Sequence, residues 1–314
     1  VEQEEQGVQI GLSFESFVIE RWMRERDVFV SAAKELGAEV NVQNANGDVK
    51  EQISQIEYFI RKQVDVIVVV AGDCEALTDV MIKAREAGIK TVSYDRLIQN
   101  AGCDLYISFD NTEVGRLMAR SLLENIPDGG DIFLIQGPLT DHNVTLVREG
   151  IDETLAGSNL SVVYESNCAG WIAENAYTYT KEGLKQDRYV KGIICGNDDL
   201  ASQAFRALSE ERLAGKVYVT GQDGDLAACQ RIVEGTQEMT AFKSVEQEAS
   251  MAAKCAVLLG LGEEIEEARS TAYDGTYQVP YLELQPIAVT GENMDEVIIK
   301  GGFHAKEDVY LNVN

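Results

Sequence analysis

The feature that most constrains the fold is a regular alternation of short apolar runs with amphipathic stretches. Continuous Val/Ile runs such as Val66–Val70 are typical of strands covered by helices on both faces. Repeated β–α alternation predicts parallel, doubly wound sheets with right-handed crossovers. The predicted strands are Val8–Ser13, Glu39–Gln43, Val66–Val70, Ile89–Ser93, Leu105–Ser108, Ile132–Gln136, Val162–Glu165, Gly192–Cys195, Val217–Thr220 and Met239–Phe242.

Ten strands are more than one doubly wound sheet of this type usually contains, and the β–α alternation restarts near residue 130. The pattern therefore predicts two similar α/β domains with a ligand between them, crossing near Ser108–Asp110. Apolar residues at helical spacing predict helices over Arg21–Leu36 and Val49–Arg61. Asn111 is expected to cap a helix, and Gly150, with Gly37 and Gly88, to mark a helix end or a turn.

Charge and hydropathy exclude several classes of partner. The chain of 314 residues has 27 basic and 53 acidic residues and a net charge of −26, which disfavours nucleic acid. No apolar run is long enough to span a membrane, and no signal peptide is recognised. The polar stretch Val1–Gln6 leads directly into the first strand, which fits a cytosolic protein or a secreted chain whose leader was removed.

Motifs for the common catalytic and cofactor sites are absent from the sequence. There is no Gly-x-Ser-x-Gly elbow and no glycine-rich phosphate loop, so no cofactor is expected. Two histidines and six cysteines without ligand spacing predict no metal site. Asp95 and Asp223 could form a glycosidase pair, but Arg96 and Gln222 beside them favour ionised carboxylates, whereas a general acid must hold its proton.

Polar residues follow several predicted strands, where open parallel sheets bind ligands. They are Tyr94-Asp95-Arg96, Asn197-Asp198, Gln222-Asp223 and Lys243. Carboxylate, amide and guanidinium groups match the hydroxyls of a sugar, and flat aromatic side chains match its C–H faces. Trp22 and Trp171 each lie in a turn after a strand and are candidates for this role, with a core position as the alternative.

Seven segments together resemble a known family. They are Glu20-Arg21-Trp22, Gln43-Asn44-Ala45-Asn46-Gly47, Ser54-Gln55-Ile56-Glu57, Tyr94-Asp95-Arg96, Tyr106-Ile107-Ser108-Phe109-Asp110-Asn111, Gly221-Gln222-Asp223 and Gly301-Gly302-Phe303-His304. In this order they resemble the D-xylose-binding proteins of bacterial ABC importers, in the type 1 periplasmic binding protein superfamily, from Val8 to about Asp308. Glucose/galactose-type relatives share much of this pattern, and the Glu-Arg-Trp turn favours xylose.

The resemblance implies two Rossmann-like lobes joined by three hinge segments, the sugar in the cleft, and no catalysis. The expected lobes are residues 1–108 plus 245–278 and residues 109–244 plus 279–314. The family's sugar-contacting positions fall on Arg21, Trp22, Asp95, Arg96, Asn143, Arg148, Trp171, Asn197, Asp223 and Lys243. This chain departs from the family's pattern in His142, where relatives tend to have Asn, and in its six cysteines.

The sequence thus predicts a monomeric extracytoplasmic receptor, in the periplasm or lipid-tethered at the cell surface. We expect it to capture D-xylose by hinge closure and to deliver it to the membrane permease of an ABC importer. Glucose, galactose and arabinose remain alternative ligands. A sugar-processing enzyme and the sugar domain of a transcription regulator are the alternative classes, although little sequence precedes Val8 to form a DNA-binding headpiece.

Overall fold

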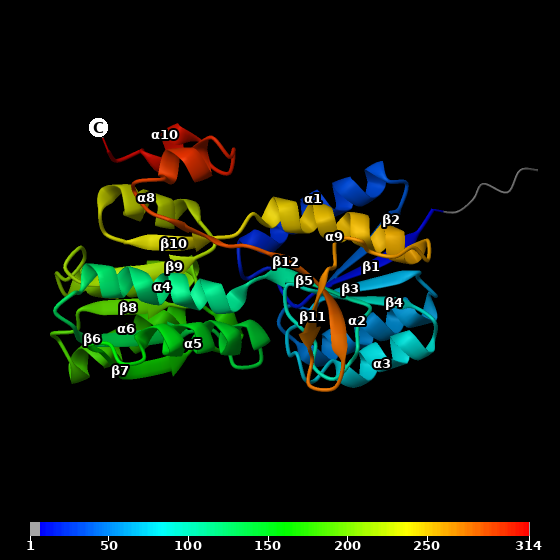
Figure 1. Ribbon diagram of the computed structural model, residues 1–314, viewed down its shortest axis with the longest axis horizontal. Coiled ribbons are helices and arrows are strands. Elements are labelled where there is room, and N and C mark those ends of the chain that lie inside the picture. Colours follow the sequence, from blue (N-terminus) through cyan, green and yellow to red (C-terminus); the bar gives the residue numbers. More distant parts are fainter. Residues whose placement is uncertain (1–6, 314) are drawn as a thin grey trace, which may run out of the picture. The chain divides into compact units, whose positions relative to one another are not determined.

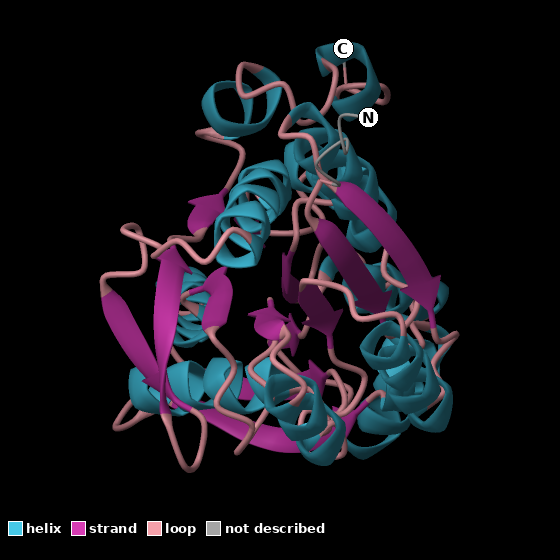
Figure 2. Cartoon of the chain, turned by 90° about the vertical axis from the view of Figure 1, so that its right-hand side faces the viewer, coloured by secondary structure: helices cyan, strands magenta, loops and turns pink. Residues whose placement is uncertain are grey.

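The computed structural model describes residues 7–313, and the chain divides into two compact units. The first unit runs up to Phe109 and includes Thr140–Asn143 and Ser244–Leu284. The second comprises Asp110–Leu139, Val144–Lys243 and the segment from Gln285 onward. Each unit is a sheet of mostly parallel strands with helices packed along it (Figures 1 and 2), which confirms the predicted fold class. The polar stretch Val1–Gln6 lies outside the described residues.

The first unit has a seven-stranded sheet in the order β11-β12-β5-β4-β3-β1-β2. On β3, Ile67 and Val69 pack in a core cluster with residues of α2 and α3, while Val66 faces Gly260 of α9 on the other side. The strands are β1 (Gln9–Phe14), β2 (Glu39–Asn44), β3 (Val66–Val70), β4 (Lys90–Tyr94), β5 (Leu105–Phe109), β11 (Ser270–Tyr273) and β12 (Gln278–Leu284), and the helices are α1 (Arg21–Glu35), α2 (Val49–Arg61), α3 (Thr78–Glu86) and α9 (Val245–Gly260).

The second unit has a six-stranded sheet in the order β13-β10-β9-β8-β6-β7. On β6, Ile132 and Leu134 pack in a core cluster with residues of α4 and α5, while Phe133 faces Gly183 of α6. The strands are β6 (Gly130–Gln136), β7 (Leu160–Asn167), β8 (Gly192–Cys195), β9 (Tyr218–Gln222), β10 (Met239–Phe242) and β13 (Ile287–Val289), and the helices are α4 (Asn111–Asn125), α5 (His142–Leu155), α6 (Glu174–Gln186), α7 (Asp198–Glu210), α8 (Leu226–Glu234) and α10 (Lys306–Val309). The first two residues of α5, His142 and Asn143, belong to the first unit. A short 3₁₀ turn (Ala169–Trp171) and a π turn (Asp295–Ile299) complete the elements.

All ten predicted strands are present, but each sheet also carries an antiparallel pair that the sequence analysis missed. β11 and β12 form a hairpin whose turn is closed by Asp274, which accepts hydrogen bonds from the backbone N–H of Thr276 and Tyr277. β12 also pairs with β5, so 279–284 lie with the first unit rather than with the second, where we expected them.

Two predicted helix boundaries are wrong. Asp110 rather than Asn111 caps α4, because its Oδ1 accepts a hydrogen bond from the backbone N–H of Glu113 at 3.0 Å. Gly150 lies within α5, where a Cβ atom would collide with the backbone carbonyl of Thr112 on α4. The glycine therefore serves close packing of two helices and not a helix end.

No helix between residues 7 and 313 has both the length and the hydrophobicity that a membrane crossing requires.

All six cysteines are buried free thiols, as expected for Cys195 and Cys255 in particular. Burial raises the pKa of Cys103 to about 11 and that of Cys74 to about 12. Because the thiolate is the reactive form, buried thiols with raised pKa values react slowly.

We expect a thiol reagent such as Ellman's to find almost no reactive cysteine in the native protein at mildly alkaline pH. In denaturing guanidinium chloride all six should react, with or without prior reduction. A rapid reaction of the native chain, or a denatured count that rises after reduction, would contradict the buried free-thiol assignment.

Candidate functional site

Five of the predicted site residues form one connected group in the first unit: Arg21 and Trp22 at the start of α1, Asp95 and Arg96 after β4, and Asn143 at the start of α5. All five are buried. Asp95 lies at its centre, directly after β4. Its carboxylate lies 3.0 Å from Arg21 Nη2 and accepts a hydrogen bond from Asn143 Nδ2 at 2.9 Å. The group is therefore a preformed arrangement of charges and amides.

The backbone at Asp95 is held in an unusual conformation. Its φ is 65°, in the left-handed region that non-glycine residues seldom adopt. Ser108 Oγ donates to the Asp95 carbonyl at 2.6 Å, and Asn143 Nδ2 donates to the same carbonyl at 3.1 Å. These contacts hold the residue in a conformation that costs about 1–3 kcal/mol.

Arg96 is bound by two acidic residues that the sequence analysis did not select. Its Nε lies 3.0 Å from Asp141 Oδ2, its Nη1 lies 3.5 Å from Glu15 Oε1, and Nη1 also donates to the Ala71 carbonyl at 2.8 Å. Glu15 follows β1 directly, so the rule that selected Asp95 after β4 could have found it. Asp141 comes from the distant segment Thr140–Asn143, and no local pattern marks it.

Trp22 lies on the buried side of α1 and is 1% exposed. The guanidinium carbons of Arg21 and Arg96 lie 4.1 and 5.4 Å from the centroid of its ring. Its Nε1 is buried without a hydrogen-bond partner among the described residues. The indole ring thus packs against both guanidinium groups, and its N–H donor is not used by any described residue.

In the second unit, Asp223 follows β9 and forms an ion pair with Lys243 at 3.3 Å. The φ of Asp223 is 102°, so this residue too is in a strained conformation. Asp198 secures the turn that follows: its Oδ2 accepts from the backbone N–H of Asp225 at 3.0 Å and from Thr240 Oγ1 at 2.7 Å. Thr240 Oγ1 in turn accepts from the backbone N–H of Gly224. Burial raises the pKa of Asp198 to about 7.

Three amide side chains at neighbouring strand ends have buried polar atoms without hydrogen-bond partners among residues 7–313. Asn197 caps α7 through Oδ1, which accepts from the backbone N–H of Leu200, and this leaves Nδ2 unused. Gln222 Nε2 donates to the Gly196 carbonyl at 2.6 Å, and Oε1 is unused. Gln136 Nε2 at the end of β6 is also unused. The sequence analysis named Gln222 among the polar strand ends but did not select Gln136, although it also ends a strand.

Trp171 lies against glycine backbone. Its indole covers Gly137 and Gly196, so closely that a Cβ atom on Gly137 would overlap the ring. Its φ is 58°, which is exceptional for a bulky side chain. The indole position in this unit therefore depends on the absence of a side chain at Gly137.

Arg148 is a predicted site residue that the structure places neither in the first-unit group nor with Asp223 and Lys243 of the second unit. It lies on α5 with its side chain 32% exposed and forms ion pairs with Asp152 at 2.8 Å and with Glu165. It lines a shallow groove of about 210 Å³ that also includes Gln136 and Asn167.

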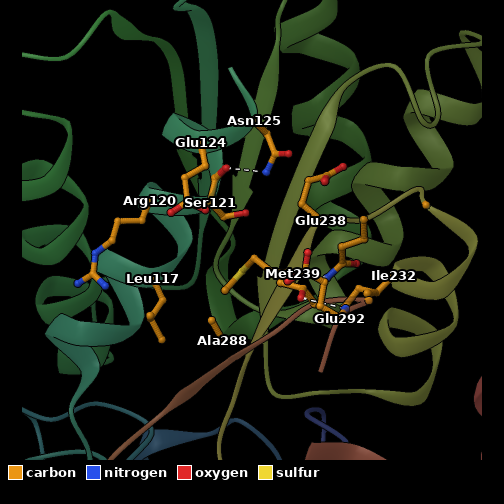
Figure 3. Close-up of a pocket in the computed structure, with 14 residues that line it drawn as sticks. Leu117, Arg120, Ser121, Glu124, Asn125, Ile232, Glu238, Met239, Ala288 and Glu292 are labelled. Atoms are coloured by element: carbon orange, nitrogen blue, oxygen red, sulfur yellow. Dashed lines mark hydrogen bonds between the residues drawn. The ribbon is translucent and has the colours of Figure 1, made fainter. Parts of the chain in front are cut away.

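A larger groove of about 510 Å³ lies elsewhere in the second unit. Figure 3 shows Glu124, Glu238, Glu292 and Arg120 around it, and Met239 at the amino end of β10. It therefore lies at the amino end of a strand, whereas Asp223 lies at the carboxyl end of the neighbouring β9. Within the described chain no group of three or more His, Cys, Asp or Glu residues could hold a metal ion.

A family model described as "Periplasmic binding protein domain" matches residues 10–264. The chain belongs to the periplasmic binding protein family. This match confirms the family predicted from the sequence.

Two curated members of this family are similar over nearly their full lengths. The D-xylose-binding periplasmic protein of Haemophilus influenzae is 43% identical, with 96% of this chain and 92% of the relative covered. The protein of the same name from Escherichia coli is 39% identical with the same coverage. A solved solute-binding protein of an ABC transporter from Clostridium phytofermentans, with bound β-D-glucose, is 25% identical, has a TM-score of 0.88, and matches over 96% of this chain and 99% of that one.

We expect Gly137→Ala to displace the Trp171 indole and to shift its fluorescence emission, because the added methyl group occupies the space of the ring. Measurement in a Trp22→Phe background isolates the signal of Trp171. Gly291→Ala is the matched control, since a Cβ atom there meets nothing within 4 Å. An unchanged emission in Gly137→Ala would show that the ring does not rest on this glycine.

Proposed function

We propose that this protein is an extracytoplasmic receptor that binds D-xylose and delivers it to the permease of an ABC importer. It acts by binding and not by catalysis. The proposal assigns sugar contacts to Arg21, Asp95, Arg96 and Asn143 in the first unit, supported by Trp22. In the second unit it assigns them to Trp171, Asn197, Asp223 and Lys243, while Arg148 must first leave its ion pairs.

The observation that carries this proposal is a set of buried polar atoms that have no hydrogen-bond partner within residues 7–313. Trp22 Nε1 and Asn143 Oδ1 belong to the first unit, and Gln136 Nε2, Asn197 Nδ2 and Gln222 Oε1 belong to the second. A buried polar group without a partner costs about 1–3 kcal/mol. Since the set contains donors and acceptors, hydroxyl groups, which do both, suit it better than an anion.

The charges of the first group also favour an uncharged ligand. Arg21 and Arg96 are accompanied by five buried carboxylates: Glu15, Glu25, Asp95, Asp141 and Glu248. Hydrogen bonds from sugar hydroxyls to charged groups contribute about 1.5–3 kcal/mol each. A few of them exceed the roughly 8 kcal/mol of micromolar binding, before ordering costs are subtracted.

The identity of the sugar rests on the relatives named D-xylose-binding, at 43% and 39% identity. Because a solved relative contains bound β-D-glucose, glucose is the alternative ligand that the experiment must compare with xylose. Delivery to a permease, location in the periplasm or at the cell surface, and capture by hinge closure remain predictions from the sequence.

A thermal-shift panel of pentoses and hexoses tests the ligand. We expect D-xylose to raise the melting temperature saturably, by binding the folded state alone, while glucose, galactose and arabinose act only at higher concentration. The anion xylonate should have no effect, because the carboxylates of the first unit repel it. Conversion of xylose to a product would instead favour an enzyme. A larger rise in melting temperature with glucose would show that glucose, and not xylose, is the preferred ligand.

Substitution of Asp95 tests the site. We expect Asp95→Asn to weaken xylose binding by about 100-fold, since charge-assisted hydrogen bonds of 1.5–3 kcal/mol each are lost. Asn tolerates the left-handed backbone at this position, so the variant isolates the charge, whereas Asp95→Ala adds backbone strain.

Asp104→Ala serves as the control in the same calorimetric titration. Asp104 accepts a hydrogen bond from the backbone N–H of Thr91 at 2.9 Å, at the amino ends of β4 and β5. Its loss should lower stability and leave the affinity unchanged. Native affinity in Asp95→Asn would remove Asp95 from the site.

A further inference from the structure

Arg21 is a buried guanidinium enclosed by three carboxylates. Nε donates to Glu25 Oε2 at 2.6 Å, and Nη2 donates to Glu25 Oε1 at 2.7 Å and to Glu248 Oε2 at 2.8 Å. Nη2 also lies 3.0 Å from Asp95 Oδ1. The side chains of Arg21, Glu25 and Glu248 are 5%, 1% and 0% exposed. These contacts use Nε and Nη2 of the guanidinium.

The two glutamates come from different helices. Glu25 lies one turn after Arg21 on α1, and its Oε1 also accepts a hydrogen bond from Tyr94 Oη at 2.6 Å. Glu248 lies in the first turn of α9, which packs against α1 (Figure 1). Arg21 is therefore fixed from its own helix and from a helix more than 200 residues later.

Stability alone explains this cluster poorly. A buried ion pair often stabilises a fold no more than well-packed apolar side chains of the same volume. Here three carboxylates surround a single arginine, which adds repulsion between like charges. The arrangement does, however, restrict the guanidinium to one orientation, with Asp95 on one side and the Trp22 ring on another.

We propose that Glu25 and Glu248 are positioning residues of the sugar site, which hold the Arg21 guanidinium in the orientation in which it fixes Asp95 and contacts the ligand. The proposal rests on the proposed function of this site. Neither glutamate needs to touch the sugar. They affect affinity only by orienting Arg21. Residues that only stabilise the packing of α1 on α9 would affect affinity whether or not Arg21 is present.

A double-mutant cycle with D-xylose in calorimetric titration tests this role. We expect Glu248→Ala to weaken binding about tenfold, because Arg21 can then reorient. Glu248→Gln should restore part of this loss, because its amide oxygen still accepts from Nη2. In an Arg21→Met background, Glu248→Ala should change Kd less than about twofold, because the group that it positions is gone.

Glu246→Ala is the matched control. Glu246 lies in the same turn of α9, but its side chain is 53% exposed and lies 3.7 Å from Arg24 instead. It should leave Kd unchanged. Circular dichroism and melting curves establish that each variant is folded before titration, and Arg21→Leu replaces Arg21→Met if the latter does not fold.

Native affinity in folded Glu248→Ala, or an equal loss in the Arg21→Met background, would overturn the positioning role. Failure of the parent chain to bind any sugar of the panel would instead overturn the proposed function. The two failures are thus distinguishable.

Discussion

The need to pair every buried charge governs the strand ends of this protein. Arg21 is enclosed by Glu25, Glu248 and Asp95, and Lys243 pairs with Asp223. An unpaired charge at such depth would cost several kcal/mol, so each side chain is confined to the geometry of its partner. The same pairing that makes burial possible also orients these groups before any ligand arrives. Less ordering then remains to oppose binding.

Backbone strain occurs at three of the candidate residues, and also at Asn46, Gln63, Asn100 and Arg212. Asp95, Trp171 and Asp223 have positive φ values, and all three were selected from the sequence as ligand-binding candidates. Such conformations persist only where surrounding contacts enforce them. Ser108 and Asn143 bind the Asp95 carbonyl, and Asp198 secures the turn after Asp223. The contacts that hold these backbone conformations therefore also fix the directions of the attached side chains.

Local pattern found the residues that directly follow strands and missed those whose role depends on distant packing. Asp95 and Asp223 follow apolar runs and stand out as poor core residues. Glu248 looks like any acidic residue in a first helical turn, and only the packing of α9 on α1 brings it to Arg21. Arg148 shows the opposite case, because the family resemblance selected it while neighbouring Asp152 and Glu165 hold its side chain outside both groups.

The sequence by itself determined the α/β class, the ten main strands and the polar strand ends, because the spacing of apolar residues and their distance from a strand end are local properties of the chain. Tertiary structure alone decided the place of β12, the close packing of α4 on α5 at Gly150, and the partners of each buried charge. Those features depend on contacts between segments far apart along the chain. No local spacing encodes them, since burial and pairing exist only once the segments have packed together.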